Sequence, residues 1–451
     1  MKVEGEAGGS SEGPLRHMAW AQEQRFLGVG VRLRHGGDVL ARHGAALTDA
    51  EEALVRGACG PVEDLVAGRL AALRGRLWRA PAWLDRLRQA GLTPNDLRSV
   101  ADLAHFPLLT RDELAARWSE LVDVDGDPEL HVATSSGTSG QALLVPRSGY
   151  DGVHMWAVLR FWCRHLRIAL PARPRLVLLD VLPGGLEYRD PAPGLGPGGA
   201  LVRVSTVRPR PLERLVAARP AILSSDPAGL HWLLGALPEA PSPIAPRLVL
   251  SSAQALPEPL RVAVTERLGA PVVDYYAATE VGPMAWRCPL SPGRLHVLHP
   301  DVHVESFGGR LVVTRLRDSV APLLRYEIGD TAGIVEGSCS CGAVGVDIAG
   351  FGGREACWLV APGGRRVDAW SLSWLFKDLP LCRFELVQVA LDGFVLSLPP
   401  DVPVGPELLA ERIRRVLVRQ GFEAPVVRVR VAEVRASAKP RPFRSLLEPT
   451  R

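Results

Sequence analysis

The segment best suited to chemistry is a run of hydroxyl and glycine residues, TSSGTSGQ, at positions 134–141. It follows the apolar residues LHVA, so we expect a strand that leads into a loop. Glycine amides and small hydroxyl groups can approach an anion closely, because no bulky side chain stands in the way. The loop lacks the Gly-Lys-Ser/Thr ending of a Walker loop. The pattern indicates an anion-binding loop, with an ordinary Ser/Gly surface loop as the alternative.

Two acidic segments could complete such a site. The sequence DYYAATE ends with Thr279 and Glu280, and an acid beside a hydroxyl can hold a magnesium ion against phosphate oxygens. In the sequence YEIGD, Asp330 follows a glycine turn, and a carboxylate can accept hydrogen bonds from both hydroxyls of a ribose. Taken alone, Glu280 is equally well a solvated strand end, and Asp330 is equally well a turn aspartate.

Four residues with metal-ligand chemistry lie between positions 288 and 341. Cys339 and Cys341 supply two thiolates within one turn, and Cys288 and His296 flank an expected hairpin. Three thiolates and one imidazole suit a tetrahedral, structural zinc site. Because C-x-C is tighter than the usual C-x2-C spacing, unpaired buried cysteines are the alternative. The nearby imidazoles that could replace that of His296 are those of His299 and His303.

Lysine is so rare in this chain that each lysine needs a reason. Only Lys2, Lys377 and Lys439 stand among 53 basic residues. Arginine is bulkier and stays protonated, so a site that needs a compact ammonium group cannot use it. Lys439 is therefore a candidate for such a site, and a surface lysine in a basic tail is the alternative.

The elements that must position these residues belong to a large folded chain. With 451 residues, of which 47% are apolar and 23% charged, it can bury a sizeable core, which excludes a disordered tail. A net charge of +4 predicts a small-molecule partner rather than nucleic acid. Seven cysteines, an odd number, argue against a disulfide framework. No apolar run reaches the roughly 18 to 20 residues of a membrane span, and no signal core begins the chain, so we expect a cytoplasmic protein.

The hydrophobic pattern changes along the chain and predicts an α/β fold. We expect residues 1–14 to be disordered and residues 50–130 to form a helical N-terminal layer. From there to position 350, short β-type runs alternate with helical segments, which indicates mostly parallel sheets flanked by helices. After a glycine-rich break, strands mix with one amphipathic helix. We therefore expect a large domain, 1–352, and a small mobile α+β lid domain, 353–451.

In this order and spacing, the segments together resemble the adenylate-forming (acyl-CoA synthetase) superfamily, most closely its phenylacetate-CoA ligase-like branch. The resemblance spans residues 85–445 and includes GLTPNDLRSVADLAHFPLLTRDEL, TSSGTSG, DYYAATE, RLHV, RYEIGD, CSCG, GGRE and a late lysine. It implies a ligase that uses ATP and magnesium to convert a small, most simply aromatic, carboxylic acid into an acyl-adenylate. This makes chemical sense, because a carboxylate becomes a good electrophile only when its oxygen becomes a leaving group. The acyl group would pass to a thiol, first of all that of coenzyme A.

The same resemblance implies a role for each candidate residue. The phosphate-binding residues would be Ser135, Ser136, Gly137, Thr138, Ser139 and Gly140. The other nucleotide-binding residues would be Ser252, Ala253, Gln254, Asp274, Tyr275, Tyr276, Ala277, Thr279, Asp330 and Arg354. Glu280 would ligate magnesium, and Lys439 would reach from the small domain to the carboxylate and the α-phosphate; with Thr138, these two would be catalytic. Some relatives are similar at the Cys/His positions, where zinc pins the loop before the hinge.

The chain also departs from the pattern of this superfamily. Gln141 stands where many relatives have lysine, SAQAL replaces a Gly-Glu pair beside adenine, and Ala277 replaces a glycine. After Arg354, the sequence Glu-Ala-Cys replaces the acidic pair of the hinge. A carrier-protein phosphopantetheine arm or an amine is therefore an alternative acceptor, and an inactive nucleotide-binding scaffold is an alternative of another class. Because relatives are dimers, we expect a homodimer. The aromatic residues Trp156, Phe161 and Trp162 either stack on the substrate or belong to the core.

Overall fold

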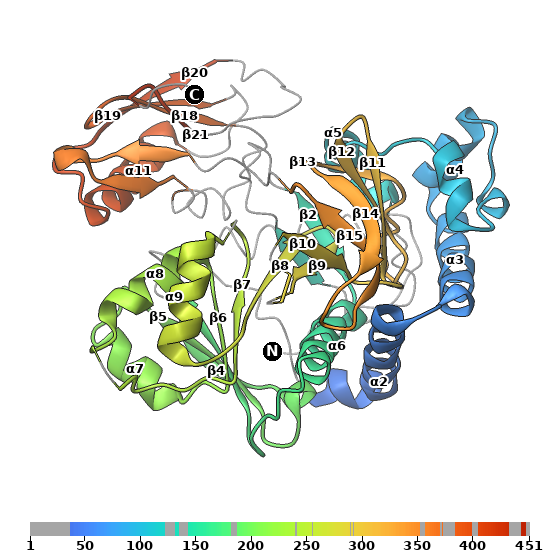
Figure 1. Ribbon diagram of the computed structural model, residues 1–451. Coiled ribbons are helices and arrows are strands. Elements are labelled where there is room, and N and C mark those ends of the chain that lie inside the picture. The colour runs from blue at the N-terminus through green and yellow to red at the C-terminus, as the bar shows by residue number, and fades with distance from the viewer. Residues whose placement is uncertain are drawn as a thin grey trace, which may run out of the picture.

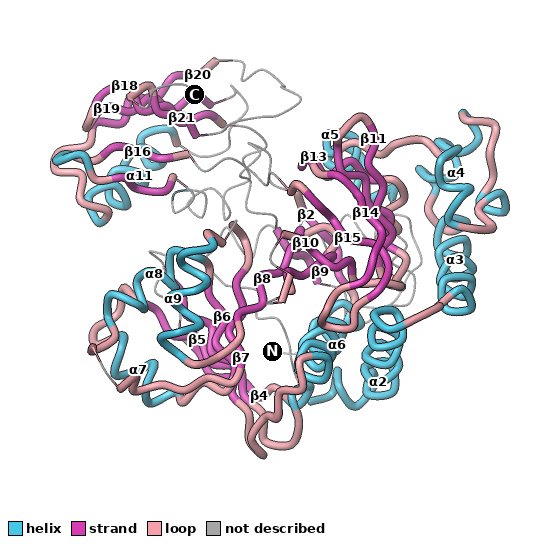
Figure 2. The backbone as a smooth tube through the Cα atoms, viewed as in Figure 1, coloured by secondary structure: helices cyan, strands magenta, loops and turns pink. Residues whose placement is uncertain are grey.

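The computed structural model is shown in Figure 1, with its elements coloured by type in Figure 2. It describes residues 37–121, 131–134, 143–181, 187–239, 241–254, 256–288, 290–291, 293–351, 357–369, 372, 384–398, 405–432 and 443–447. Within these residues, no helix combines the length and the apolar character that crossing a membrane requires.

The N-terminal part of the described chain is helical. It contains α2 (Gly37–Cys59), α3 (Glu63–Trp78), α4 (Pro81–Gln89) and α5 (Arg111–Leu121). On α3, residues three and four apart share one face, so Leu70, Leu73 and Leu77 are buried together. These leucines join a core that includes Trp83 of α4. The helical spacing of the leucines therefore serves to attach this layer to the rest of the molecule.

A ten-stranded sheet forms the centre of the molecule, in the order β14-β15-β10-β9-β8-β7-β6-β3-β5-β4. Its parallel part consists of β3 (Arg175–Asp180), β5 (Ala200–Ser205), β6 (Ile222–Ser225), β7 (Leu248–Ser251) and β8 (Val272–Ala278). Its antiparallel part consists of β4 (Tyr188–Pro191), β9 (Gly282–Arg287), β10 (Arg294–Val297), β14 (Gly333–Ser338) and β15 (Val344–Ala349). The expected α/β architecture is confirmed, with antiparallel strands added at both ends of the parallel part.

Both faces of the parallel strands are covered by helices, which explains their continuous apolar sequences. One face packs against α2 and α6 (Gly149–His165), with Leu176, Ile222 and Val273 in that core. The opposite face packs against three more helices, with Val177 and Leu223 in the second core. Those three helices are α7 (Pro211–Ala218), α8 (Pro227–Ala236) and α9 (Glu258–Leu268), which lie together in Figure 1.

Two smaller sheets flank the antiparallel end of the large sheet. The first is the antiparallel pair of β1 (His131–Thr134) and β2 (Leu144–Arg147), which precede and follow the Ser/Gly segment in the sequence. The second is formed by β11 (Val302–Phe307), β12 (Arg310–Arg315) and β13 (Tyr326–Thr331).

The C-terminal elements have a hydrophobic core of their own. They are β16 (Trp358–Val360), β17 (Arg366–Asp368), β18 (Glu385–Ala390), β19 (Gly393–Leu398), α11 (Pro406–Arg419), β20 (Val426–Val431) and β21 (Phe443–Ser445). Four of these strands form a sheet in the order β20-β19-β18-β21, and α11 connects β19 to its parallel neighbour β20. The buried face of α11 contributes Leu409, Ile413 and Leu417 to this core.

Candidate functional site

Several sequence-predicted residues lie outside the described residues. These are the loop residues Ser135, Ser136, Gly137, Thr138, Ser139 and Gly140, together with Arg354 and Lys439. Their roles stay predictions. The remaining candidates are described, and most of them lie on β8, on the turn that follows it, or on β13.

Glu280 lies in the turn between β8 and β9, where its side chain is 3% exposed. Its Oε1 accepts a hydrogen bond from Arg111 Nη1 of α5 at 2.9 Å and another from the Tyr326 hydroxyl of β13 at 2.7 Å. Burial opposes the charge of Arg111, but the Glu280 carboxylate outweighs it and raises the pKa of that guanidinium. Burial and the same carboxylate raise the pKa of Tyr326 well above its usual range. The Glu280 side chain therefore links the turn between β8 and β9 to α5 and to β13.

Asp330 and Tyr276 lie side by side. The Tyr276 hydroxyl donates a hydrogen bond to Asp330 Oδ2 at 2.5 Å, between β8 and β13. The Tyr276 ring also packs against Phe351, with ring centroids 4.5 Å apart. Phe351 lies at the end of the described segment that precedes the GGRE sequence. An aromatic ring and a carboxylate at one edge of the sheet can contact a base and hold ribose hydroxyls.

The tyrosine that precedes Tyr276 points the other way, because successive side chains of a strand alternate between faces. Tyr275 packs against Trp162 of α6 and is hydrogen-bonded to Ser252. Trp162 belongs to the buried core, as do Trp156 and Phe161. Of the two interpretations of this aromatic stripe, the core is confirmed.

The segment SAQAL follows β7 at the same edge of the sheet as Tyr276. Ala253 is exposed and has a φ of 75°, in the region that favours glycine. Gln254 is partly buried. On β8, Asp274 lies 3.4 Å from Arg287 Nε, and burial raises the pKa of this carboxyl to about 6 in spite of that arginine. Along β8, Asp274 is further from the Glu280 turn than the other candidates, Tyr275, Tyr276 and Ala277.

Three guanidinium groups hold the backbone of the turn between β8 and β9. Arg147 of β2 donates to the carbonyl of Thr279, and Arg315 of β12 donates to that of Glu280 at 2.9 Å. Arg317 donates to the carbonyl of Val281 at 2.8 and 2.9 Å, and also to Asp151 of α6 at 3.2 Å. Three successive carbonyl groups thus each have an arginine donor, which fixes the turn that carries Glu280.

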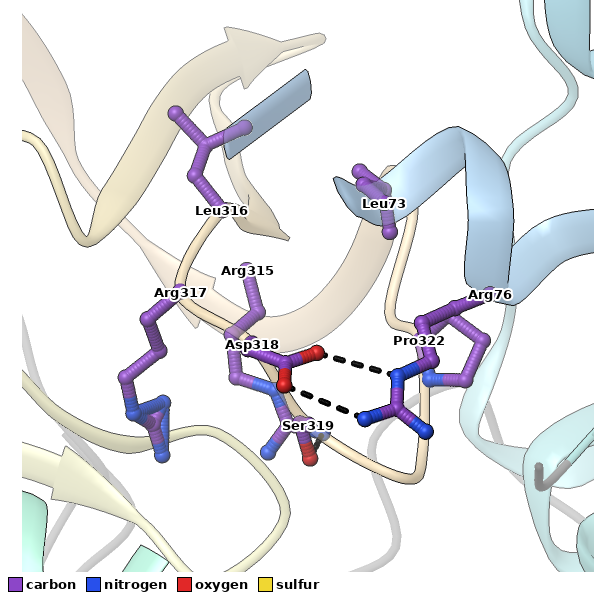
Figure 3. Close-up of a pocket in the computed structure, with 8 residues that line it drawn as sticks. All are labelled: Leu73, Arg76, Arg315, Leu316, Arg317, Asp318, Ser319 and Pro322. Carbon is purple, nitrogen blue, oxygen red and sulfur yellow. Dashed lines mark hydrogen bonds and ion pairs between the residues drawn. The ribbon is translucent and has the colours of Figure 1, made fainter. Parts of the chain in front are cut away.

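Arg315 and Arg317 flank a small pocket beneath α3, in which Asp318 points to Arg76 (Figure 3). Gly282 lies directly against Arg317: it has a φ of 89°, and a Cβ there would lie 2.7 Å from Arg317 Nη2. The close approach of this arginine to the turn therefore requires glycine.

The chain also offers a test of whether these residues fit magnesium. Magnesium ions prefer octahedral oxygen coordination with one or two carboxylates and substrate phosphates. In this structure the Glu280 carboxylate already accepts from Arg111 and Tyr326, and Arg111 balances its charge. This arrangement does not fit a magnesium ligand, so we derive no step through the ion, and the magnesium role of Glu280 stays a prediction.

The structure brings the four predicted zinc ligands together. The ligand atoms of Cys288, His296, Cys339 and Cys341 all lie within 4.8 Å of one another. We call these four residues the Cys/His cluster. Cys288 follows β9, His296 is on β10, and the two other cysteines lie in the β14–β15 turn. The Leu290 amide donates to the Cys288 sulfur at 3.3 Å, and the Ala343 amide donates to that of Cys341 at 3.4 Å. These contacts suit thiolates, which accept hydrogen bonds from amides.

The surroundings of the cluster orient its imidazole. His296 Nδ1 is 2.6 Å from Asp347 Oδ1, which leaves Nε2 facing the cysteines, 3.5 Å from the Cys341 sulfur. Burial opposes protonation of His296, but bonds to Asp347 and Cys288 raise its pKa to about 10. Hydrogen bonds from Cys341 and His296 outweigh burial and lower the pKa of Cys339 to about 7. Three sulfurs and one carboxylate-held imidazole fit a structural zinc ion.

Comparisons with known proteins agree with this geometry. The phenylacetate-coenzyme A ligase of Thermus thermophilus is 26% identical over 312 residues, which are 63% of this chain and 68% of that protein. The phenylacetate-coenzyme A ligase of Aromatoleum evansii is 23% identical over 372 residues, 76% of this chain and 83% of that protein. This chain is similar to phenylacetate-coenzyme A ligases. The resemblance stated from the sequence is confirmed. No family model matches the chain.

Solved structures show that this relative of the phenylacetate-coenzyme A ligases has the fold of acyl-CoA ligases. The 2-hydroxyisobutyryl-CoA ligase in complex with 2-HIB-AMP and CoA in the thioesterification state has a TM-score of 0.55 at 18% identity. The same ligase in the postadenylation state, with R3-HIB-AMP, has a TM-score of 0.53 at 17% identity. Both alignments cover 86% of this chain and 91% of the ligase.

Sequence reasoning missed several residues that shape the site. They are Arg111, Arg147, Arg315 and Arg317 around the Glu280 turn, and Asp347 beside His296. A signal existed for one pair, since Arg315 ends β12 and Arg317 follows it, between the apolar residues of that strand and the buried stretch from Ser319 to Leu324. The others are single charged residues that only the tertiary structure brings to the site.

Proposed function

We propose that this protein activates a small, aromatic carboxylic acid as its acyl-adenylate, with ATP as the second substrate, and transfers the acyl group to the thiol of coenzyme A. The observation that carries the proposal is the placement of Tyr276 beside Asp330, next to the turn of Glu280, in a relative of phenylacetate-coenzyme A ligases. The neighbouring fold, that of 2-hydroxyisobutyryl-CoA ligase, supports the same class of reaction.

In this proposal each described residue has a chemical task. Asp330 accepts hydrogen bonds from the ribose hydroxyls, and Tyr276 holds that carboxylate and contacts the base. Glu280 ties Arg111 and Tyr326 together and so keeps the turn between β8 and β9 rigid. A rigid frame matters, because catalysis of phosphoryl-type chemistry is mostly positioning and charge stabilisation. A magnesium ion that arrives with ATP would neutralise charge on the phosphates, and we assign no described residue to hold it.

The residues outside the described ranges complete the proposal. The hydroxyl and amide donors of the loop 135–140 bind the phosphates, with Thr138 among them, and Lys439 brings a compact cation to the reacting carboxylate and α-phosphate. The C-terminal elements, which have their own core, form the small lid domain of residues 353–451. Its movement between two positions would serve adenylation and thioester formation in turn.

We also propose that the Cys/His cluster binds one structural zinc ion. The four ligand atoms, their amide contacts and the Asp347 bond to His296 support this. Elemental analysis of protein purified without chelator should find about one zinc per chain, and Cys339→Ser should lower that to near zero. The exposed Cys59 offers the matched control, since Cys59→Ser should leave the zinc content unchanged. A wild-type protein without zinc would contradict the assignment.

One feature of the sequence favours an alternative to coenzyme A as the acceptor of the acyl group. The hinge of this chain has Glu355, Ala356 and Cys357 after Arg354, so the swing that brings in coenzyme A rests on different residues from those of its relatives. A carrier-protein phosphopantetheine arm or an amine would then take the acyl group. The homodimer expected from the relatives stays a prediction that sedimentation tests.

The deciding experiment measures pyrophosphate release with ATP and magnesium across a panel of aryl and alkyl carboxylic acids, with and without coenzyme A. We expect release that depends on one aryl acid, and its thioester only when coenzyme A is present. Release that is acid-dependent but yields no thioester would favour the other acceptors. No release with any acid would contradict the proposal and support the inactive scaffold.

A further inference from the structure

The turn that carries Glu280 lies in an excess of buried positive charge. The guanidinium groups around it are those of Arg111, Arg147, Arg315 and Arg317. The carboxylates among them, within the described residues, are those of Asp151 and Glu280. Four cations thus face two anions in a region where Arg315, Arg317 and both carboxylates are almost completely buried.

The acids next to this group do not balance the charge, because each has an arginine of its own. Asp318 is paired with Arg76 at the edge of the pocket in Figure 3. Asp301 is fully buried and is paired with Arg69 and with His154. Adding these pairs to the group leaves the same excess of two positive charges.

Arg147 differs from the other three arginines. Arg111 is bound to the Glu280 carboxylate, Arg317 to that of Asp151, and Arg315 to acceptors at Glu280, Ser319 and Ala321. Arg147 makes one hydrogen bond with the described residues, to the Thr279 carbonyl at 2.7 Å, and no ion pair with them. Its side chain is also partly exposed, whereas those of Arg315 and Arg317 are buried. Arg147 is therefore the cation of this group that a ligand can reach.

Physical chemistry indicates what that ligand is. Burial and the neighbouring Arg317 lower the pKa of Arg147, and the carboxylates of Asp151 and Glu280 offset this only in part, so its charge is incompletely compensated. An anion beside it would restore the balance. The planar guanidinium presents several donors in a fixed fork, which matches phosphate oxygens. Arg147 also ends β2, the strand that follows the Ser/Gly loop, and its hydrogen bond holds it beside Glu280.

We propose that Arg147 binds the phosphate chain of ATP and supplies the positive charge that the neutral donors of the Ser/Gly loop lack. This assignment rests on the proposed function, because it takes ATP as the substrate. Gln141, at the end of that loop, is uncharged, so the loop itself contributes hydroxyl and amide donors only. The cation comes instead from the strand that follows.

The test compares ATP with adenosine, which lacks phosphates. Titration calorimetry in magnesium buffer would measure both dissociation constants for the wild type, Arg147→Gln and Arg147→Lys. We expect Arg147→Gln to weaken ATP binding at least about tenfold, since a charge-assisted pair is lost, and to change adenosine binding less than about twofold. Arg147→Lys keeps the charge without the fork, so its affinity for ATP should fall between the two.

Arg74 provides a matched control. It is also a partly buried arginine with one hydrogen bond to a backbone carbonyl, from Nη1 to Leu97 at 2.8 Å, but it lies on α3. Arg74→Gln should therefore leave both dissociation constants unchanged. If Arg147→Gln does not fold, as thermal unfolding will show, Arg147→Lys carries the test, with ATP affinity falling and adenosine affinity unchanged.

Two results would overturn the proposal. One is ATP binding by Arg147→Gln that equals that of the wild type, and the other is an equal loss of ATP and adenosine affinity in either variant. Failure of the proposed function would look different. A wild-type protein that binds ATP but releases no pyrophosphate with any acid would refute the ligase reaction, and the ATP and adenosine comparison would still decide the role of Arg147.

Discussion

Two polar clusters lie at the antiparallel end of the large sheet, and their side chains suit ligands of opposite charge. The Cys/His cluster gathers three sulfurs and an imidazole, with the Asp347 carboxylate behind them. The cluster around Glu280 gathers four guanidinium groups and two carboxylates. The Cys/His cluster offers ligand atoms that suit a metal cation, whereas the Glu280 cluster offers guanidinium groups that suit an anion. Both are held by the same strand, β9, which begins at Gly282 and ends next to Cys288.

We infer that the two ends of β9 serve different purposes. The Cys/His cluster at one end stabilises the fold, and the Glu280 cluster at the other end serves ligand binding. At the Cys/His cluster, the ligands come from β10, from the end of β9 and from the turn between β14 and β15, so a bound ion would tie these segments together. At the Glu280 cluster, arginines from distant elements already tie the turn, and the charge that they leave over is available for substrate. Each cluster can be altered without touching the other.

The largest effect should come from removing the charge of Glu280. Glu280→Gln leaves Arg111 buried without its carboxylate and raises the positive excess, so we expect the free energy of unfolding to fall by about 3–5 kcal/mol. Pyrophosphate release should fall at least about a hundredfold. Chemical denaturation and the pyrophosphate assay measure the two effects.

Glu327→Gln is the control for that change. Glu327 is on β13, next to Tyr326, and it pairs with Arg310, whose side chain is half exposed. Surface pairs contribute about 0–1 kcal/mol, so stability and turnover should stay close to those of the wild type. Equal effects of the two variants would show that the buried pair of Glu280 and Arg111 contributes no more to stability and turnover than an exposed pair does.

A smaller effect should come from the carboxylate behind the Cys/His cluster. Asp347→Asn keeps the four ligand atoms but weakens the bond that orients His296, so zinc affinity should fall by about ten- to a hundredfold. Competition with a chromophoric chelator measures this. ATP affinity should not change, and a parallel loss of ATP binding would break the separation of the two clusters.

The smallest effect concerns Asp274, which lies on β8 opposite Arg287 of β9. Its pKa is raised to about 6 by burial, so the folded protein binds its proton more tightly than the unfolded chain does. The wild type should therefore lose about 1–2 kcal/mol of stability relative to Asp274→Asn as the pH rises from 4 to 6. The difference should level off above about pH 7, where the carboxyl is ionised in both the folded and the unfolded state. Denaturation at a series of pH values checks this, and parallel curves for the two proteins would contradict the burial of a charged carboxylate.

Local patterns predicted the parallel part of the fold, because runs such as RLVLLD and LVLS are apolar on both faces only when helices cover both sides of the sheet. They did not predict the antiparallel extension. The pairing of β10 with β15, for instance, joins residues about fifty positions apart. The sequence of neither strand indicates which strand it will pair with. Long-range pairing is a property of the whole chain and not of any window within it.

The candidate site also consists of residues that the sequence predicted and residues that it did not. Glu280, Asp330 and the four residues of the Cys/His cluster stand in distinctive short motifs, so the sequence pointed to them. The arginines did not stand out, because arginine supplies nearly all of the 53 basic residues and most are exposed. Only burial distinguishes Arg315 and Arg317, and burial depends on contacts with β9 and α6 that come from elsewhere in the chain.

The contact between Gly282 and Arg317 has a consequence for how this segment can evolve. A methyl group at position 282 would push the guanidinium away from the Val281 carbonyl, and the left-handed backbone there already disfavours other residues. Ala277, five positions earlier, is exposed and carries no such restriction. In a saturation library of this segment, selection for activity should therefore recover many residues at position 277 and glycine alone at position 282.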